Sequence, residues 1–320
     1  MIKYSIIVPT IKNNYYLEKL YLKFKKFDTR IDIEFIVISN QQIQFTFEFK
    51  KIIYKNIVSE IRHPGRKRDL AFKYSRGKYL IFIDDDAFFE TNYFDELDSL
   101  LELNEYEVLC GPNITPKDDT FLGKLSGSTY LNPFLGVSYR YKISKKDIIK
   151  SVDDFPSVNL VISSKLFSKV KGFDNDFWPG DDSYLCNKII ENHSEIFFFN
   201  KLIVYHYRRS SLIKHFRQVY RYGLTRGYFF KLNLKNSKKL TYILPSIFLV
   251  FNLFLLLNFK FYLIFNIIIY FIFLLSSVFS NKNIFIAFLS PLLIILNFYN
   301  YGFAFIKGYF SKKFISKLGR

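Results

Sequence analysis

The chain has 320 residues, half of them hydrophobic, and this composition excludes a disordered chain. Its two cysteines, Cys110 and Cys186, have no Cys or His partner at metal-ligand spacing, so neither a disulfide framework nor a zinc module is indicated and a reducing compartment is expected. The net charge of +18 is uneven: 18 basic and no acidic residues follow Glu195, whereas the 28 basic and 28 acidic residues before position 201 balance. The neutral front argues against nucleic acid as a partner.

The front of the chain alternates between short apolar runs and segments of helical periodicity. We expect strands at 3–8, 33–38, 79–83, 107–110 and 156–162, and helices at 15–27, 66–75 and 91–103, the last with Thr91 as its N-cap. This alternation predicts an α/β fold with a doubly wound, mostly parallel sheet. Such sheets bind ligands at the carboxyl ends of their strands.

Three aspartates, Asp84, Asp85 and Asp86, directly follow the strand predicted at 79–83. Adjacent carboxylates repel one another, so a fold that keeps them ionised commonly supplies a cation. Oxygen ligands suit Mg²⁺ or Mn²⁺, which bind one or two carboxylates together with substrate phosphates. A metal site and a simple turn cap are both open interpretations of this short motif.

A second acidic pair, Asp181 and Asp182, follows Trp178-Pro179-Gly180 and opens a segment of helical spacing. The N-terminus of a helix stabilises an ionised carboxylate, and this suits a general base at neutral pH. Asp181 has an alternative role as the helix N-cap. Asp182 has no such structural need, so it is the stronger candidate for the base.

A third motif, Tyr205-His206-Tyr207-Arg208-Arg209, ends another apolar run. A lone His near a strand is weak evidence for a ligand. The two arginines are able to hold a diphosphate through charge-assisted hydrogen bonds. They are equally suited to begin a basic patch that faces a membrane.

The rear of the chain contains three apolar runs, at 241–259, 261–279 and 283–305, each near the roughly 20 residues that a membrane-spanning helix needs. The first residues do not resemble a signal peptide. The basic cluster at 208–239 precedes the first run, and such clusters stay on the cytoplasmic side near anionic headgroups. We therefore expect a multi-pass membrane protein with its front domain, at 1–235, on the cytoplasmic side and a transmembrane region at 236–320.

The basic tail does not fit three full spans. Three crossings would place Lys312, Lys313, Lys317 and Arg320 on the far side, against the positive-inside tendency. Either one segment is re-entrant or interfacial, or the tail is an exception. The proline at position 291 makes the third segment the weakest candidate.

In order, these motifs resemble the family 2 glycosyltransferases with the glycosyltransferase A-type fold, over roughly residues 3–230. Ser5–Thr10 (SIIVPT) is similar to the opening strand and nucleotide loop, and Ile83–Ala87 (IDDDA) to the Asp-x-Asp motif. Gly172-Phe173-Asp174 and Gly180-Asp181-Asp182 are similar to the acceptor-side segment, in which the second acidic residue is the usual base.

The resemblance implies a role for each candidate residue. Asp84, Asp86 and His206 would hold Mg²⁺ or Mn²⁺, and Asp182, beside Asp181, would deprotonate the acceptor. The nucleotide-sugar site would comprise Pro9, Thr10, Asn40, Arg68, Asp84, Asp85, Arg208 and Arg209. The implied reaction is an inverting transfer of a sugar, of the hexosyl type, from a nucleotide diphosphate sugar to a hydroxyl of a lipid-linked or cell-surface glycan, with membrane lipids as further partners.

Two positions depart from the family pattern. The second strand ends at Ser39-Asn40, where members commonly have an acidic residue that recognises the base, and Gln218–Tyr222 (QVYRY) lacks the Trp of the processive synthases. A single transfer is therefore expected over polymerisation. A polyprenyl-phosphate sugar synthase and a non-enzymatic membrane scaffold with the same fold are the alternatives.

Overall fold

The computed structural model describes residues 1–135, 137–144, 146–314 and 316. By their internal contacts, residues 1–114 and 143–206, together with 316, form one compact unit, and residues 115–142 and 207–314 form a second. These units do not coincide with the domain boundary predicted at residue 235, which stays a prediction.

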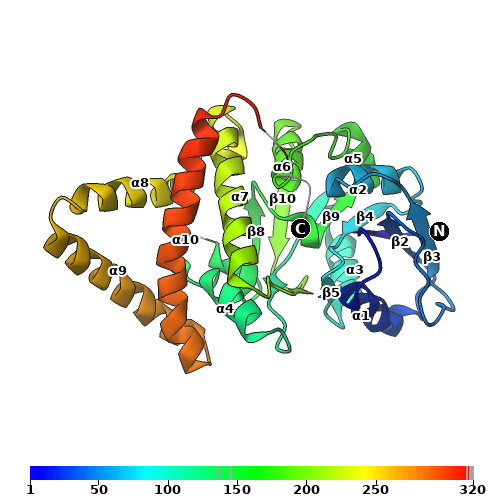
Figure 1. The fold of residues 1–320 in the computed structure, drawn as a ribbon. Helices are drawn as coiled ribbons and strands as arrows, with labels where there is room; N and C mark the ends of the chain where they lie inside the picture. The colour runs from blue at the N-terminus through cyan, green and yellow to red at the C-terminus, as the bar shows by residue number, and fades with distance from the viewer. Residues whose placement is uncertain (136, 145, 315, 317–320) are drawn as a thin grey trace. The chain divides into compact units, whose positions relative to one another are not determined.

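The first unit is built on a sheet that has eight strands among the described residues (Figure 1). Six strands run in one direction, and β9 and β8 run against them. The mostly parallel sheet predicted from the alternating pattern is therefore confirmed. The strand order is β3 (Ile53–Val58), β2 (Ile33–Ser39), β1 (Tyr4–Pro9), β4 (Tyr79–Phe82), β9 (Leu160–Ser163), β6 (Val108–Cys110), β10 (Ile196–Phe199) and β8 (Ile149–Val152).

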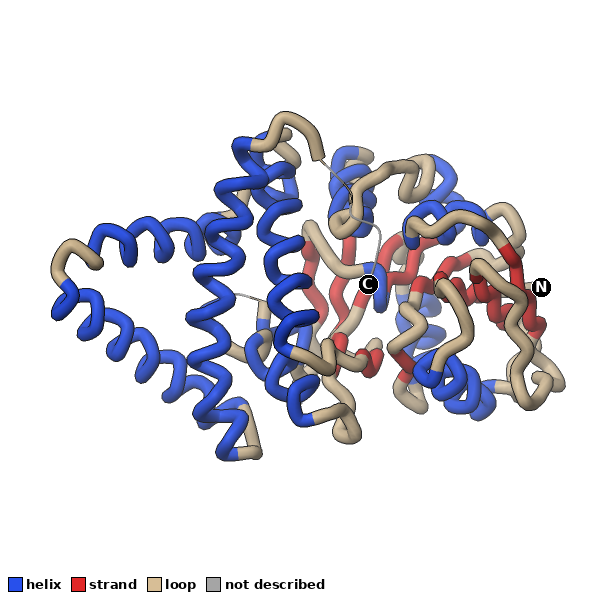
Figure 2. The backbone as a smooth tube through the Cα atoms, viewed as in Figure 1, coloured by secondary structure: helices blue, strands red, loops and turns tan. Residues whose placement is uncertain are grey.

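Helices cover both faces of this sheet (Figures 1 and 2). Their bounds are α1 (Tyr15–Phe24), α2 (Pro64–Phe72), α3 (Tyr93–Leu103), α5 (Ser164–Lys169) and α6 (Asp181–Glu191). On one face, Phe24 of α1 contacts Phe35 of the sheet and Phe94 of α3. On the opposite face, Phe167 of α5 contacts Phe82 of β4. Apolar side chains on both faces explain why β1, β2 and β4 are fully buried runs.

A buried carboxylate connects the parallel strands by hydrogen bonds inside this apolar core. Glu34 on β2 is fully buried and accepts hydrogen bonds from the Ser5 hydroxyl (2.6 Å), the Lys55 ammonium (2.6 Å) and the Arg76 backbone N–H (2.5 Å). Ser5 in turn accepts from the Gly77 N–H at 2.8 Å. These bonds connect β1, β2 and β3 to the loop that precedes β4.

A small second sheet follows β4 in the same unit. It consists of β5 (Ala87–Phe89), β11 (Val204–His206) and β7 (Asn113–Ile114), with β11 in the centre. β11 pairs antiparallel with β5, and His206 lies opposite Ala87. This pairing brings two segments more than a hundred residues apart next to each other.

The second unit is helical, with α4 (Phe121–Thr129), α7 (Leu212–Lys231), α8 (Leu240–Leu255), α9 (Phe259–Ser280) and α10 (Ile284–Phe310). Two of its helices, α9 and α10, are long and apolar enough to cross a membrane, and this is weak evidence for spans. Buried polar side chains connect the bundle, because His215 of α7 bonds both Ser126 of α4 (2.7 Å) and Asn297 of α10 (3.0 Å).

Several expectations about individual elements were wrong. The third apolar run is not the weakest candidate span: α10 continues through Pro291 for 27 residues, whereas α8 has only 16. The helix expected to begin at Thr91 has Asn92 at its N-cap position. β3 was not predicted, because its sequence (IYKNIV) contains no continuous apolar run. It lies at the edge of the sheet, where its side chains are half-buried or exposed. Lys317 and Arg320 of the basic tail lie outside the described residues.

We predict that Glu34→Ala lowers the stability of the first unit by about 3 kcal/mol, because it leaves the Lys55 ammonium without its buried partner. The change would appear as a lower apparent melting temperature of the purified full chain. Glu102→Ala, which removes an exposed carboxylate from α3, should shift it by much less. Equal shifts in the two variants would contradict a stabilising role for the Glu34 network.

Candidate active site

The Asp84–Asp86 turn lies at the carboxyl end of β4, between the large sheet and the small one. The Ala87 N–H donates to the Asp84 carbonyl at 3.1 Å and closes the turn. Asp85 is buried, and its carboxylate accepts from the Thr10 hydroxyl (2.6 Å) and the Asn14 amide (3.0 Å). Asp85 therefore connects the turn to the end of β1, and its neighbours Asp84 and Asp86 remain as candidate ligands.

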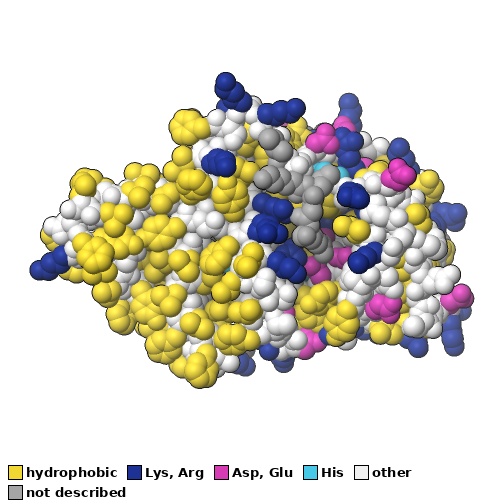
Figure 3. Space-filling view, viewed as in Figure 1, with side chains coloured by type: hydrophobic (Ala, Val, Ile, Leu, Met, Phe, Trp, Pro, Cys, Tyr) yellow, Lys and Arg dark blue, Asp and Glu magenta, His cyan; other side chains and the backbone are white. Residues whose placement is uncertain are grey.

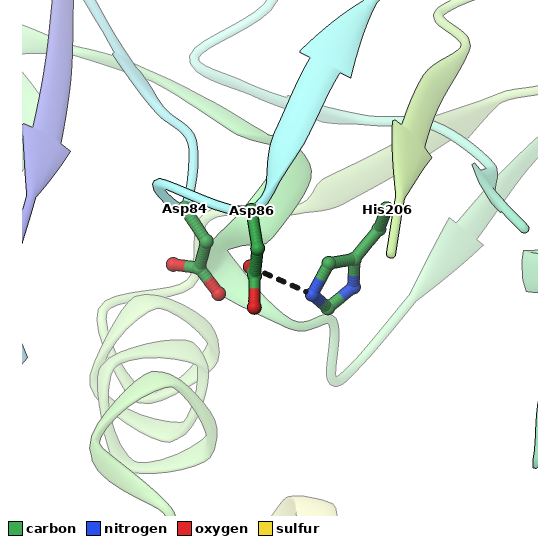
Figure 4. Close-up of side chains that lie close together, drawn as sticks. All are labelled: Asp84, Asp86 and His206. Carbon is green, nitrogen blue, oxygen red and sulfur yellow. Dashed lines mark hydrogen bonds and ion pairs between the residues drawn. The ribbon is translucent and has the colours of Figure 1, made fainter. Parts of the chain in front are cut away.

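Asp84, Asp86 and His206 lie close together, as Figure 4 shows. One ligand atom from each lies within 4.8 Å of the other two, and His206 Nε2 is 3.1 Å from Asp86 Oδ1. Asp86 is buried, while Asp84 and His206 are half-buried. The β5–β11 pairing places His206 here, so a residue that meant little alone in the sequence joins both aspartates.

The donor set of this cluster fits a divalent cation. Ligand atoms bound at 2.0–2.6 Å to one ion lie up to roughly 4–5 Å apart, which is the spacing of these three groups. Two carboxylates suit Mg²⁺ or Mn²⁺, and an imidazole nitrogen favours the transition metal. Asp84, Asp86 and His206 are thus the residues that would hold the ion.

The second acidic pair opens helix α6. Gly180, at the N-cap position, has φ +116°, a conformation that L side chains rarely adopt. Asp181 is therefore not the N-cap. Its carboxylate is buried, whereas that of Asp182 is half-buried and accepts from the Ser183 N–H at 2.8 Å.

Arg68 of α2 joins the two acidic groups. Its guanidinium contacts Asp84 Oδ1 (Nη2, 2.6 Å) and Asp181 Oδ2 (Nη1, 3.4 Å), and its side chain is only 3% exposed. α2 approaches closely here because residue 65 is glycine: a Cβ at this position would lie 3.0 Å from Asp181 Oδ2. Carboxylates almost a hundred residues apart in the chain thus share one buried cation.

The environment of Asp181 changes its acidity. Burial raises the pKa of this carboxyl, and the Asp84 charge raises it further, while Arg68 opposes both, with a resulting pKa of about 6. Asp181 is therefore mostly ionised at neutral pH. Its contact with Arg68 suits a positioning role better than proton abstraction.

The predicted nucleotide residues at the ends of β1 and β2 share a partner that the sequence analysis missed. Lys67 is 1% exposed, and its ammonium donates to the Thr10 carbonyl and to Asn40 Oδ1 (2.8 Å for the latter). Burial lowers the pKa of Lys67 to about 8, against the opposing charge of Asp85. Pro9, at the end of β1, is also buried.

Asp69 is a second residue that the sequence analysis missed. Its carboxylate accepts from the backbone N–H groups of Phe173 (2.7 Å) and Asp174 (2.9 Å) and so holds the turn at Gly172-Phe173-Asp174. The charged run Arg66-Lys67-Arg68-Asp69 on a helix with little amphipathic character was the available signal.

Arg208 and Arg209 belong to the second unit. The Arg208 backbone N–H donates to Asp119 (2.9 Å), and its guanidinium lies over the rings of Tyr130 (5.8 Å) and Tyr141 (5.1 Å). Their proposed contact with a diphosphate stays a prediction.

Comparison with known proteins finds relatives that match part of this chain. Poly(ribitol-phosphate) β-N-acetylglucosaminyltransferase TarS from two Staphylococcus aureus strains, Mu50 and MW2, is 22% identical over 117 residues, which is 34% of this chain and 20% of TarS. The chain thus matches about a fifth of the length of these curated relatives.

Solved structures of S. aureus TarS are also similar. One crystal structure has a TM-score of 0.49 at 16% identity and covers 78% of this chain and 43% of TarS. A structure of TarS residues 1–349 in complex with UDP-GlcNAc has a TM-score of 0.48 at 13% identity. The match covers 96% of this chain and 92% of that structure.

A family model, described as glycosyl transferase family group 2, matches residues 79–304. The match exceeds two thirds of the chain and includes the Asp84–Asp86 turn, the Asp181-Asp182 pair and His206. With the mostly parallel sheet, it confirms the expected glycosyltransferase A-type fold followed by a helical region. The chain belongs to glycosyl transferase family group 2.

Proposed function

We propose that this chain is an inverting, metal-dependent glycosyltransferase that moves a sugar from a nucleotide diphosphate sugar to a hydroxyl group of a lipid-linked or cell-surface glycan at the cytoplasmic face of a membrane. The observation that carries the proposal is the buried Arg68, which joins the Asp84–Asp86 turn to the Asp181-Asp182 pair. Donor-side and acceptor-side carboxylates of one transfer reaction must lie near each other, and Arg68 supports this arrangement.

The cluster of Asp84, Asp86 and His206 would hold Mn²⁺ or Mg²⁺. When bound, the ion neutralises the diphosphate leaving group. The remaining binding is assigned to the chain itself: Pro9, Thr10 and Asn40 lie at the ends of β1 and β2 and would contact the nucleotide, and Lys67 holds Thr10 and Asn40.

Asp182 is the proposed general base. Its carboxylate is half-buried, the Ser183 N–H orients Oδ1, and the Ser157 N–H donates to Oδ2 at 3.4 Å. It would take the proton from the acceptor hydroxyl as that oxygen attacks the anomeric carbon from the side opposite the leaving group. One displacement of this kind inverts the anomeric centre, through a transition state of oxocarbenium character. Asp181 would hold Arg68 and keep α6 in position.

The relatives indicate which nucleotide-sugar donor should be tested first. TarS is named as an N-acetylglucosaminyltransferase, so UDP-N-acetylglucosamine belongs in the first panel of donors. Released nucleoside diphosphate, measured with the detergent-solubilised chain, would identify the donor. A polyprenyl-phosphate sugar synthase would instead require polyprenyl phosphate as its sole acceptor.

We predict that Asp182→Asn lowers the rate of sugar transfer by about 10²–10⁴-fold, because the amide cannot accept the proton, and leaves donor affinity within about twofold. Transfer is followed by product formation and donor binding by calorimetry. Asp176→Asn, an exposed aspartate in the same segment, is the matched control and should be near wild type. Substantial turnover by Asp182→Asn would exclude this residue as the base.

We predict that Asp86→Ala weakens Mn²⁺ binding at least about tenfold, because it removes a buried ligand shared with His206. Titration of free Mn²⁺ by electron paramagnetic resonance measures this without reference to activity. His206→Ala should have a smaller effect in the same direction, and Asp95→Ala, at an exposed position of α3, should have none. Unchanged Mn²⁺ affinity in Asp86→Ala would refute the metal site.

A further inference from the structure

An apolar groove of about 740 Å³ lies along α8 in the second unit. One face of α8 lines it with Ile243, Ile247, Val250 and Phe254, and α10 contributes Phe305 and Tyr309. The Ser246 hydroxyl donates to the Gly302 carbonyl at 3.1 Å, so this polar group is already used. The chemistry of the lining suits a hydrocarbon chain and not a polar ligand.

Basic residues adjoin, along the chain, residues that line this groove, which also include Phe230 and Phe310. Lys231, next to Phe230, donates to the Ser311 carbonyl at 2.7 Å, and Lys312 and Lys313 follow directly. At the start of α8, Arg226 and Lys239 lie 4.5 Å and 5.8 Å from the centre of the Tyr242 ring, beside Ile243. We call these five residues the basic collar: Arg226, Lys231, Lys239, Lys312 and Lys313.

The collar lies in a segment of strongly positive net charge. No acidic residue occurs after Glu195, and the two in the second unit, Asp118 and Asp119, accept from Tyr207 and Arg208. Figure 3 shows basic side chains over the end of α10 and a hydrophobic surface over α8 and α9. The contact of Lys231 with Ser311 also brings the end of α7 next to the end of α10.

The length of the groove indicates which kind of hydrocarbon chain fits it. From Ile243 to Phe254, α8 rises by roughly 16 Å, which is about half of a hydrocarbon core of ~30 Å. This is about the length of a phospholipid acyl chain in one leaflet, so such a chain fits the groove better than a long polyprenyl chain.

We propose that the groove and the basic collar form a binding site for one anionic phospholipid, with an acyl chain along α8 and the phosphate headgroup at the collar. The inference rests on the membrane association within the proposed function, but not on its chemistry. The bound lipid would fix the second unit at a leaflet rich in anionic headgroups.

The test is native mass spectrometry of the purified full chain in neutral detergent, titrated with phosphatidylglycerol or with phosphatidylcholine of the same acyl chains. We expect one phosphatidylglycerol to bind at least about tenfold more tightly than phosphatidylcholine. Replacing two collar charges (Lys231→Gln with Lys239→Gln) should weaken this binding roughly ten- to thirty-fold. Val250→Trp, which fills the groove without changing charge, should also weaken it.

The matched control is Lys260→Gln with Lys282→Gln, which removes the same charge near the two ends of α9 and should leave binding unchanged. Equal affinity for the two lipids, equal losses in the two double variants, or displacement by inorganic phosphate would each overturn the site. Because lipid binding is measured without turnover, the two proposals fail separately. Selective lipid binding by a chain without transfer would refute only the enzyme, and transfer without lipid selectivity would refute only this site.

Discussion

The Arg68 guanidinium is the interaction on which the candidate active site depends. Asp84, Asp85 and Asp86 follow one another, and Asp181 is brought close to them, so the site gathers negative charge in a partly buried place. Without a cation, repulsion between these carboxylates would push them apart. The planar guanidinium of Arg68 presents separate N–H donors to Asp84 and Asp181. A lysine would offer a single charged atom and could not reach both carboxylates in the same way.

Helix α2 fixes the site in three directions through consecutive residues. Lys67 reaches the ends of β1 and β2, Arg68 reaches both acidic groups, and Asp69 holds the turn before α6. Successive helical positions differ by 100°, so three neighbours can point to three segments only if the helix is surrounded on most sides. This explains why α2 shows little amphipathic character and why its lysine and arginine are buried. The cost of burying them is offset by contacts that position the strand ends relative to α6.

The sequence permitted prediction of the features that depend on local pattern. Buried parallel strands such as β4 are continuous apolar runs, and the aspartates at its end follow from the rule for ligand sites in such sheets. The roles of Lys67 and Asp69 were not predictable, because their partners are backbone groups or an amide more than twenty residues away. The sequence already favoured Asp182 over Asp181 as the base, but the reason, an N-cap role for Asp181, was wrong: Gly180 is at the N-cap position, and Asp181 contacts Arg68. For His206 the family resemblance already implied a metal-binding role, and the register of β11 on β5 supplies its contact with Asp86.

Close backbone contact between α7 and α10 explains why the groove in the second unit has a fixed shape. A Cβ on Gly227 would lie 1.9 Å from the Phe305 carbonyl oxygen, and one on Gly308 would lie 2.0 Å from that of Leu224. Small residues let two helices meet without intervening side chains, as in packed membrane helices. This contact fixes the C-terminal half of α10 against α7, and α8 joins it where Gly302 approaches the Pro245 carbonyl. The aromatic side chains of α10 that face α8 therefore stand on a rigid support, and a larger residue at Gly227 would separate the helices and alter the groove.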